Sequence, residues 1–206
     1  MNTTTALTID PDTISDILYF ARTDNLPELT QTVTQVAVAN KATTSAILHL
    51  TIDTDTGNTP LHYAAANGSM QVLDFLLGLT PPDDVEIVTR ANHAGNTPLH
   101  YAALNGKLDV CELLVEKVAK WGDGEDGGMA GMRGWKLVSR KNGAGCDAVA
   151  EAERGEKDGL VVWLLGKTDE FRKAVGLAKG KEIADGKGRQ HGEIEAKIVR
   201  RNDVLG

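Results

Sequence analysis

One internal repetition constrains this 206-residue chain more than any other feature of its sequence. The segments Thr56–Leu77 and Ala94–Val115 align without a gap at an offset of 38 residues. Within them, the nine residues GNTPLHYAA recur unchanged, starting at Gly57 and again at Gly95. Such repetition predicts a chain built from copies of one small unit, which buries its apolar face only by stacking on a neighbour.

Each copy is predicted to form two short helices joined by a tight turn. A threonine precedes a proline, an order typical of an N-cap and the first helical residue, where the missing N–H of proline costs nothing. The first helix is rich in alanine, and a glycine with positive φ is expected to end it. The residues with these structural roles are Thr59, Pro60 and Gly68 in one copy and Thr97, Pro98 and Gly106 in the other.

The motif TPLHxAA resembles the signature of the ankyrin repeat. His62 and His100 match the histidine of that family, whose ring bonds local backbone and hydroxyl groups. The resemblance therefore implies that both histidines are structural. Metal binding or catalysis is the alternative role for these two side chains.

Two perfect units are too few for a stable stack, so less regular repeats are expected on both sides. On the N-terminal side, Asp24 falls where Gly106 ends the helix of the clear unit. On the C-terminal side, Gly155 aligns with Gly106 at a spacing of 49 residues, which puts Glu151 at an alanine position. The predicted fold is all-α, an ankyrin-repeat solenoid of about four repeats with short β-hairpin tips and atypical capping repeats at both ends.

The predicted organisation is a disordered N-terminus over 1–10, an ankyrin-repeat domain over 11–166 and a partly disordered basic tail over 167–206. Two insertions, 78–91 and 121–134, lengthen the repeat domain. The second holds six glycines and three acidic residues, which predicts a flexible loop with no core of its own. Such a loop is either an adaptable acidic edge of a binding surface or a tolerated surface insertion.

Charge is unevenly distributed along the chain. The whole sequence carries −7, yet Gly166–Gly206 holds ten basic and seven acidic side chains, so residues 1–165 carry −10. An acidic body repels nucleic acid. It attracts a basic protein partner and accelerates their encounter.

Two cysteines, Cys111 and Cys146, cannot build a disulfide framework or a four-ligand zinc site. Cys111 lies in an apolar helical run and is predicted to be a small buried hydrophobe. The N-terminus is polar, and no apolar run approaches the roughly 18–20 residues that cross a bilayer. Neither a signal peptide nor a membrane span is therefore expected, and the chain is predicted to reside in cytosol or nucleus.

Motifs that carry chemistry are missing from the sequence. It contains no phosphate-binding loop with a GK[ST] ending and no GxSxG, HExxH or CxxC. Its five histidines are the two motif residues and three scattered ones. No catalytic, cofactor-binding or metal-binding residue is predicted, and an enzyme is not expected.

Protein binding has positive support from the repeats. Stacked units of this kind present a concave face made of the hairpin tips and the exposed sides of the first helices. Tyr63 and Tyr101 are expected one repeat apart on that face as interface anchors; the alternative is that they only shield the helix junction. The predicted partner-binding residues are Asp24, Glu28, Asp55, Asn58, Tyr63, Asn67, His93, Asn96, Tyr101, Leu104, Asn105 and Glu153.

Beyond the repeat motif, four segments resemble one small fungal group of acidic ankyrin proteins. These segments are ILYFARTDNL near the start, GNTPLHYAALNGKLDVCELL in the middle, DAVAEAERG in the last repeat and KGKEI in the tail. Members of that group are dedicated chaperones of the small-subunit ribosomal protein uS-three. The tail of the group tends to carry a dense acidic run, whereas the tail of this chain is net positive.

The resemblance implies a chaperone that binds newly made uS-three, keeps this basic protein soluble, and supports ribosome assembly and nuclear import. It implies that a basic N-terminal helical segment of the client lies in the groove, and that import machinery is reached through the client. It also implies a monomer before client binding, found in cytoplasm and nucleus, with no direct contact to nucleic acid or membrane.

The alternative function is an adaptor in signalling or transcription that uses the same groove for a different protein. Salt dependence separates the two. Binding of a basic client in an acidic groove weakens as salt screens the charges, whereas a hydrophobic adaptor interface is affected less.

Overall fold

The computed structural model describes residues 7–82, 84–121 and 128–176, which contain eleven helices and no strand. None of the helices in these ranges is long and apolar enough to cross a membrane. The helices are α1 Pro11–Arg22, α2 Leu26–Asn40, α3 Thr44–Leu50, α4 Pro60–Asn67, α5 Met70–Gly78, α6 Val85–Thr89, α7 Pro98–Leu104, α8 Leu108–Lys120, α9 Gly128–Val138, α10 Ala148–Arg154 and α11 Asp158–Ala174.

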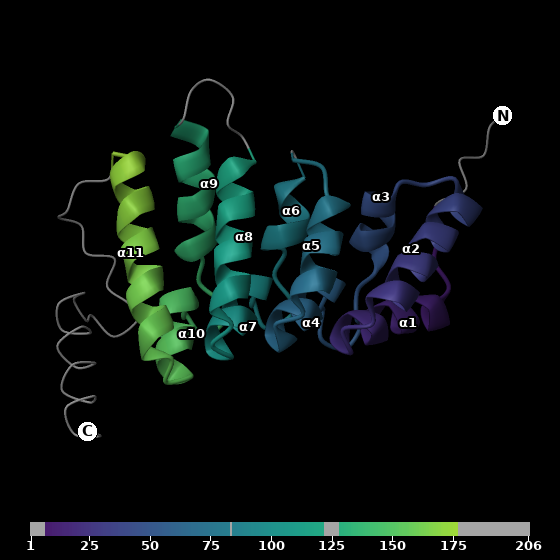
Figure 1. Cartoon of the computed structure of the whole chain (residues 1–206), viewed down its shortest axis with the longest axis horizontal. Coiled ribbons are helices and arrows are strands. Elements are labelled where there is room, and N and C mark those ends of the chain that lie inside the picture. Colours follow the sequence, from purple (N-terminus) through teal and green to yellow (C-terminus); the bar gives the residue numbers. More distant parts are fainter. Residues whose placement is uncertain (1–6, 83, 122–127, 177–206) are drawn as a thin grey trace.

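These helices form four pairs, α1–α2, α4–α5, α7–α8 and α10–α11, that stack side by side (Figure 1). The first helices pack in one row, in the order α1, α4, α7 and α10. The second helices form the next row, and α3, α6 and α9 lie in the connections between successive pairs. The predicted all-α solenoid of four repeats is confirmed.

A left-handed backbone residue follows the first helix of every repeat. Gly68 and Gly106 have φ of +81° and +69°, as predicted. Asp24 and Glu156 take the same position in the outer repeats, each with φ of +57°. Gly155, which the sequence alignment placed here, has an ordinary φ of −79°. The fourth repeat is therefore offset from the third by 50 residues rather than 49, because glycine is favoured but not required in this conformation.

Alanines let the first helices approach one another closely. Ala64 and Ala65 of α4 and Ala102 and Ala103 of α7 are fully buried, as is Ala152 of α10. The second helices supply larger groups to the same core, since a continuous core forms only between stacked units. The fully or almost fully buried side chains of α5 and α8 are Val72, Leu73, Leu76, Leu77, Val110, Cys111, Leu114, Val115 and Val118.

The tips that precede the first helices of repeats two to four are tight turns. The first side chain of each tip accepts two backbone N–H bonds at its Oδ1, and these residues are Asp53, Asn92 and Asn142. The N–H of His93 donates to the carbonyl of Thr56 at 2.9 Å, and that of Gly143 donates to Ala94 at 2.9 Å. Backbone bonds thus join adjacent tips, although none of the described residues is assigned to a strand.

Connections between the repeats contain more structure than the sequence predicts. The insertion at 78–91 includes α6, whose Ile87 and Val88 are buried. Within the insertion at 121–134, residues 122–127 lie outside the described part, but α9 begins at Gly128 and packs against both α8 and α11. The prediction of a flexible loop without a core is wrong for this helical part.

Two glycines explain how α9 fits against α11. A Cβ on Gly134 would lie 2.5 Å from the ring of Phe171, and one on Gly131 would lie 3.0 Å from the Cβ of Ala174. The first distance is shorter than two carbon atoms tolerate, and the second would require a small shift of α11. The glycine content of this segment therefore serves close helix packing here, a use that composition alone does not separate from flexibility.

The last repeat extends beyond its predicted end at residue 166. Helix α11 continues to Ala174, and the side chain of its Phe171 is buried against α9. Eight residues of the predicted tail thus belong to the repeat stack. The part of the predicted tail over 177–206 lies outside the described residues.

The first repeat also starts earlier than predicted. Leu7 and Ile9 pack against the core, and the Asp10 carboxylate caps α1 by accepting the N–H of Thr13 at 3.1 Å. Part of the segment 1–10, predicted as disordered, therefore supports the first helix. Residues 1–6 lie outside the described part of the chain.

Candidate protein-binding face

A buried histidine joins each of the two clear repeats to the next one. The N–H of Thr59 donates to Nδ1 of His62 at 3.1 Å, and the Thr59 hydroxyl lies 2.9 Å from the same nitrogen. On the other side of the ring, Nε2 lies 2.9 Å from the carbonyl of Asn96. Because Nδ1 accepts from a backbone N–H, the neutral ring carries its proton on Nε2 and donates it to the next repeat.

The second motif histidine repeats this arrangement. His100 bonds Thr97 through Nδ1 and faces the carbonyl of Cys146 at 3.1 Å through Nε2. Burial lowers the pKa of His62 to about 4 and also lowers the pKa of His100, so both rings are neutral near pH 7. With both nitrogens engaged, the rings have a structural role, as the resemblance implied.

Two other kinds of reactive site were possible in the described part of the chain, a cluster of metal ligands and a reactive thiol at Cys111. No group of three or more potential metal ligands occurs among the described residues. Cys111 is fully buried, and burial raises the pKa of its thiol to about 12, so it is not a nucleophile near neutral pH. Its predicted role as a small buried hydrophobe is confirmed.

The inner face consists of the tips together with the exposed sides of α1, α4, α7 and α10. Tyr63 and Tyr101 occupy equivalent positions on it, and both are half-buried. The hydroxyl of Tyr63 donates to Asp53 Oδ2 at 2.5 Å, and the amide of Asn92 donates to the hydroxyl of Tyr101 at 3.0 Å. Each tyrosine therefore supports the tip of its own repeat and still exposes part of its ring.

Tyr19 completes this column of tyrosines and was missed by the sequence analysis. The alignment that matches Asp24 with Gly106 also matches Tyr19 with Tyr101, so the signal was present in the sequence. Tyr19 is 60% exposed, more than any other aromatic residue of the described chain, and its ring packs edge-on against Phe20. The first repeat begins with helix rather than with a tip, so no tip side chain covers this tyrosine.

In the fourth repeat a buried carboxylate takes the place of the tyrosine. With the offset of 50, Glu151 corresponds to Tyr101, not to an alanine position. Its Oε1 accepts the side-chain amide of Asn142 at 2.7 Å, and its Oε2 lies 2.5 Å from a guanidinium nitrogen of Arg154. Glu151 is only 1% exposed, so it holds its own tip and is not available to a partner.

The remaining predicted partner-binding residues divide by exposure. Asn58 is buried and Asn96 half-buried, and they accept the side-chain amides of Asn92 and Asn142, at 2.9 Å and 2.7 Å. These two asparagines join adjacent tips and belong to the stack itself. On the inner face or beside it, Leu104 and Glu153 are half-buried, and the exposed residues are Asp24, Glu28, Asp55, Asn67, His93 and Asn105.

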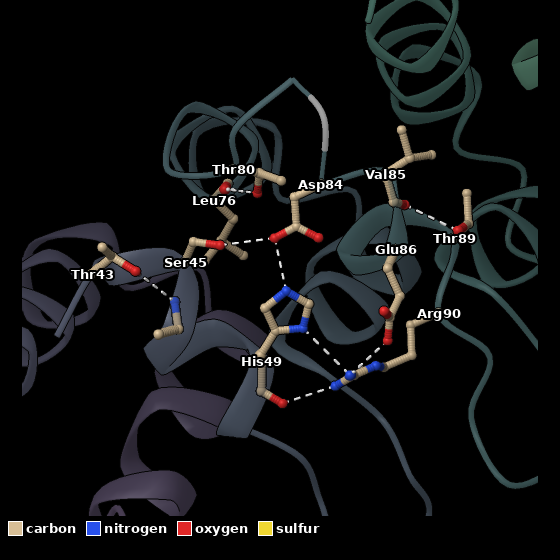
Figure 2. A network of polar contacts seen from close by, with 11 residues as sticks. Thr43, Ser45, His49, Leu76, Thr80, Asp84, Val85, Glu86, Thr89 and Arg90 are labelled. Atoms are coloured by element: carbon tan, nitrogen blue, oxygen red, sulfur yellow. Dashed lines mark hydrogen bonds and ion pairs between the residues drawn. The ribbon is translucent and has the colours of Figure 1, made fainter. Parts of the chain in front are cut away.

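A separate polar cluster joins the connecting helices α3 and α6 (Figure 2). Asp84, the N-cap of α6, accepts the hydroxyl of Ser45 at 2.9 Å and lies 2.7 Å from Nε2 of His49. The serine thus donates to the carboxylate. This is not the geometry of an activated nucleophile, in which the hydroxyl faces the imidazole.

Arg90 adds further hydrogen bonds to this cluster, and Arg140 makes a similar bond from the next connection. Arg90 donates to the carbonyl of His49 at 2.8 Å and to Glu86 at 3.0 Å, and it also faces Nδ1 of His49 (Figure 2). Arg140, which precedes the next tip by the same number of residues, donates to the carbonyl of Thr89 at the end of α6 at 2.8 Å. The cluster therefore fastens successive connections together and has a structural role.

Comparisons with known proteins agree with this architecture. A family model described as ankyrin repeats, in three copies, matches residues 20–123. A search of curated proteins found no significant match. Among solved structures, the chain is similar to the yeast chaperone Yar1 in the crystal structure of its complex with the ribosomal protein Rps3. Sequence identity is 28% and the TM-score 0.62, over 79% of this chain and 97% of that one.

The similarity confirms the resemblance to a chaperone of a ribosomal protein and extends beyond the segment that the family model matches. The family model covers half of the sequence. The four stacked helix pairs and the histidine joints agree with the repeats that this model describes. The chain belongs to the ankyrin-repeat family.

Proposed function

We propose that this protein is a dedicated chaperone of the small-subunit ribosomal protein uS-three, which corresponds to Rps3 in the yeast complex. The observation that carries the proposal is the similarity to Yar1, because it covers almost all of that chaperone at 28% identity. The client is held on the inner face, kept soluble, and passed on to ribosome assembly and nuclear import. A basic N-terminal helical segment of the client is the part that binds.

The chemistry of the inner face supports a basic client. Its exposed carboxylates and partly exposed tyrosine rings provide charge and contact area, and Asp55 and Tyr63 are examples within one repeat. The repeat scaffold and the similar chaperone indicate a role in protein interaction rather than in catalysis. Cytoplasm and nucleus are the compartments that this role requires.

The proposal is tested by capturing partners from a fungal lysate with the tagged chain at about 0.05 M and about 0.5 M salt, since screening is much stronger at the higher value. Near-stoichiometric uS-three that declines with salt supports the proposal. Purified uS-three should then form a 1:1 complex and stay in solution under conditions in which it precipitates alone. If uS-three is not captured and another protein is enriched, the chain is an adaptor for that protein.

A further inference from the structure

Net charge divides the solenoid into two unequal halves. Residues 1–92, which include the first two repeats, hold three basic and eleven acidic side chains and therefore carry −8. Residues 93–176, which include the last two repeats, hold twelve basic and thirteen acidic side chains and carry −1. Almost all of the net negative charge of the repeat stack thus belongs to the half that begins with α1 (Figure 1).

Helix α1 presents acidic and aromatic side chains together. Asp12, Asp16 and Tyr19 follow one another at spacings of four and three residues, which puts them on one face of the helix, and all three are exposed. Ile17 and Ala21 on the opposite side are fully buried against the stack. The exposed side of α1 is therefore a surface on which a cationic side chain can contact a ring and a carboxylate at once.

The tip of the second repeat carries negative charge that is not needed to form its turn. Asp53 closes this tip by accepting two backbone N–H bonds at Oδ1, as Asn92 and Asn142 do in the next two repeats, although its second donor lies three residues on rather than four. A neutral amide is therefore sufficient for the turn. The bond from Tyr63 lowers the pKa of Asp53 and holds it ionised, and the exposed Asp55 lies two residues further on.

At the other end of the stack the charge of the inner face is compensated. Arg154 pairs with Glu151, which is buried. Lys157 lies across the end of α7, with its side chain 2.7 Å from the place where Gly106 would carry a Cβ. Lys107 takes the corresponding place beside Gly68 at the end of α4. A basic segment that approaches the fourth repeat thus meets Arg154 as well, whereas one that approaches the first two repeats meets exposed carboxylates.

From this asymmetry we propose that the basic segment of the client lies across the first two repeats, with Tyr19 as its principal exposed anchor. This inference rests on the proposed chaperone function and specifies where on the inner face that function is performed. The seat comprises Asp12, Asp16, Tyr19, Asp53, Asp55 and Tyr63. The third repeat continues the tyrosine column with Tyr101, and the fourth replaces it with the buried Glu151. Neither repeat attracts the basic part of the client.

Two variants with equal change in net charge test the seat. Asp12→Asn, Asp16→Asn and Asp55→Asn together remove three charges from the first two repeats. Asp109→Asn, Glu153→Gln and Glu156→Gln together remove three from the last two. Binding of purified uS-three is measured by titration calorimetry at several salt concentrations. The first triple variant is expected to weaken binding about tenfold and to reduce its salt dependence, whereas the second is expected to bind like wild type.

The outcomes separate this seat from the function on which it rests. Equal losses in the two triple variants, or a larger loss in the second, would overturn the seat while the chaperone function stands. Absence of binding by the wild-type chain would overturn the proposed client and the seat with it. Circular dichroism melting of both variants shows whether each remains folded, which is expected because all but one of the six side chains are exposed and Glu153 is half-buried.

The aromatic anchor is tested by Tyr19→Ala with Tyr101→Ala as the control at the equivalent position of the third repeat. Tyr19→Ala is expected to weaken binding of uS-three about tenfold and to leave the melting temperature nearly unchanged, because the ring is 60% exposed. Tyr101→Ala is expected to lower the melting temperature more than the affinity. A larger loss of affinity in folded Tyr101→Ala would overturn the assignment of Tyr19.

Discussion

At the scale of single residues, the two motif histidines hold the stack together only while they are neutral. His62 accepts at Nδ1 from the backbone of Thr59 and donates from Nε2 to the carbonyl of Asn96. A second proton would place an N–H opposite the N–H of Thr59 and a charge in a buried site. The joints between the second, third and fourth repeats are therefore sensitive to acid.

The lowered pKa of His62 predicts how stability depends on pH. Since the unfolded ring titrates near 6.5 and the folded ring near 4, the unfolded state binds more protons between these values. The stability contributed by neutral His62 is thus complete above about pH 6.5 and is lost as pH falls to 4. The expected loss is about 3 kcal/mol, measured as the free energy of urea unfolding at a series of pH values.

A matched variant assigns this pH dependence to the ring. His62→Gln is less stable at pH 7 because the amide cannot reproduce both bonds of the imidazole. Its free energy of unfolding should nevertheless change less between pH 6.5 and 4.5 than that of the wild-type chain. An unchanged slope in the variant would show that other groups cause the acid sensitivity.

Substitution of Asp53 separates charge from structure at one tip. Asp53→Asn reproduces the pairing of Asn92 with Tyr101, so the variant should change the free energy of unfolding by less than about 1 kcal/mol at pH 7. It should at the same time weaken the binding of a basic client. Asp53→Ala, which cannot accept the two backbone bonds of the turn, provides the comparison and should be clearly less stable; equal stability of the two variants would contradict this account.

At the scale of helices, α9 shows how a glycine-rich insertion becomes part of a core. Composition alone predicts a flexible loop with no core of its own. The structure reverses that expectation for the helical residues, because Gly131 contacts α11 and the buried Leu137 and Val138 follow in the same helix. Glycines that permit close packing and glycines that permit motion are identical in sequence.

Alanine substitutions at two helical glycines distinguish these uses. Gly134→Ala would bring a Cβ within 2.5 Å of the Phe171 ring and is expected to cost about 1–3 kcal/mol of stability. Gly166→Ala in α11 meets no atom within 4 Å and is expected to add up to about 1 kcal/mol, since alanine favours a helix more than glycine does. Thermal and urea unfolding of the two variants measures both effects; a neutral Gly134→Ala would show that α9 does not pack closely against α11.

At the scale of the whole molecule, the sequence predicts most where the repeat is strongest. The nine identical residues determine the caps, the turns and the histidine joints of α4 and α7, and the structure agrees at each. The outer repeats are harder to place because a positive φ accepts several residue types: Glu156 adopts it beside Gly155, which shifted the alignment by one residue. That shift concealed the correspondence of Glu151 with the tyrosine column.

The candidate face was predicted less completely than the fold. Exposure cannot be deduced from position in a repeat alone, since Asn58 and Asp55 belong to the same tip, yet Asn58 is buried and Asp55 exposed. The short helices α3 and α6 were missed because segments of five to seven residues carry little periodicity. Tyr19 could have been found from the alignment, which already placed Asp24 in the same repeat.

The placement of α9 has a consequence for the shape of the stack. In the row of first helices α7 touches α10 directly, whereas in the row behind it α9 stands between α8 and α11. The outer row is therefore longer than the inner row by one helix width, about 8–10 Å, at this point alone. Extra width in the outer row alone makes a stack of helices curve. The packing of the chain itself therefore curves the stack toward its inner face at the junction of the third and fourth repeats.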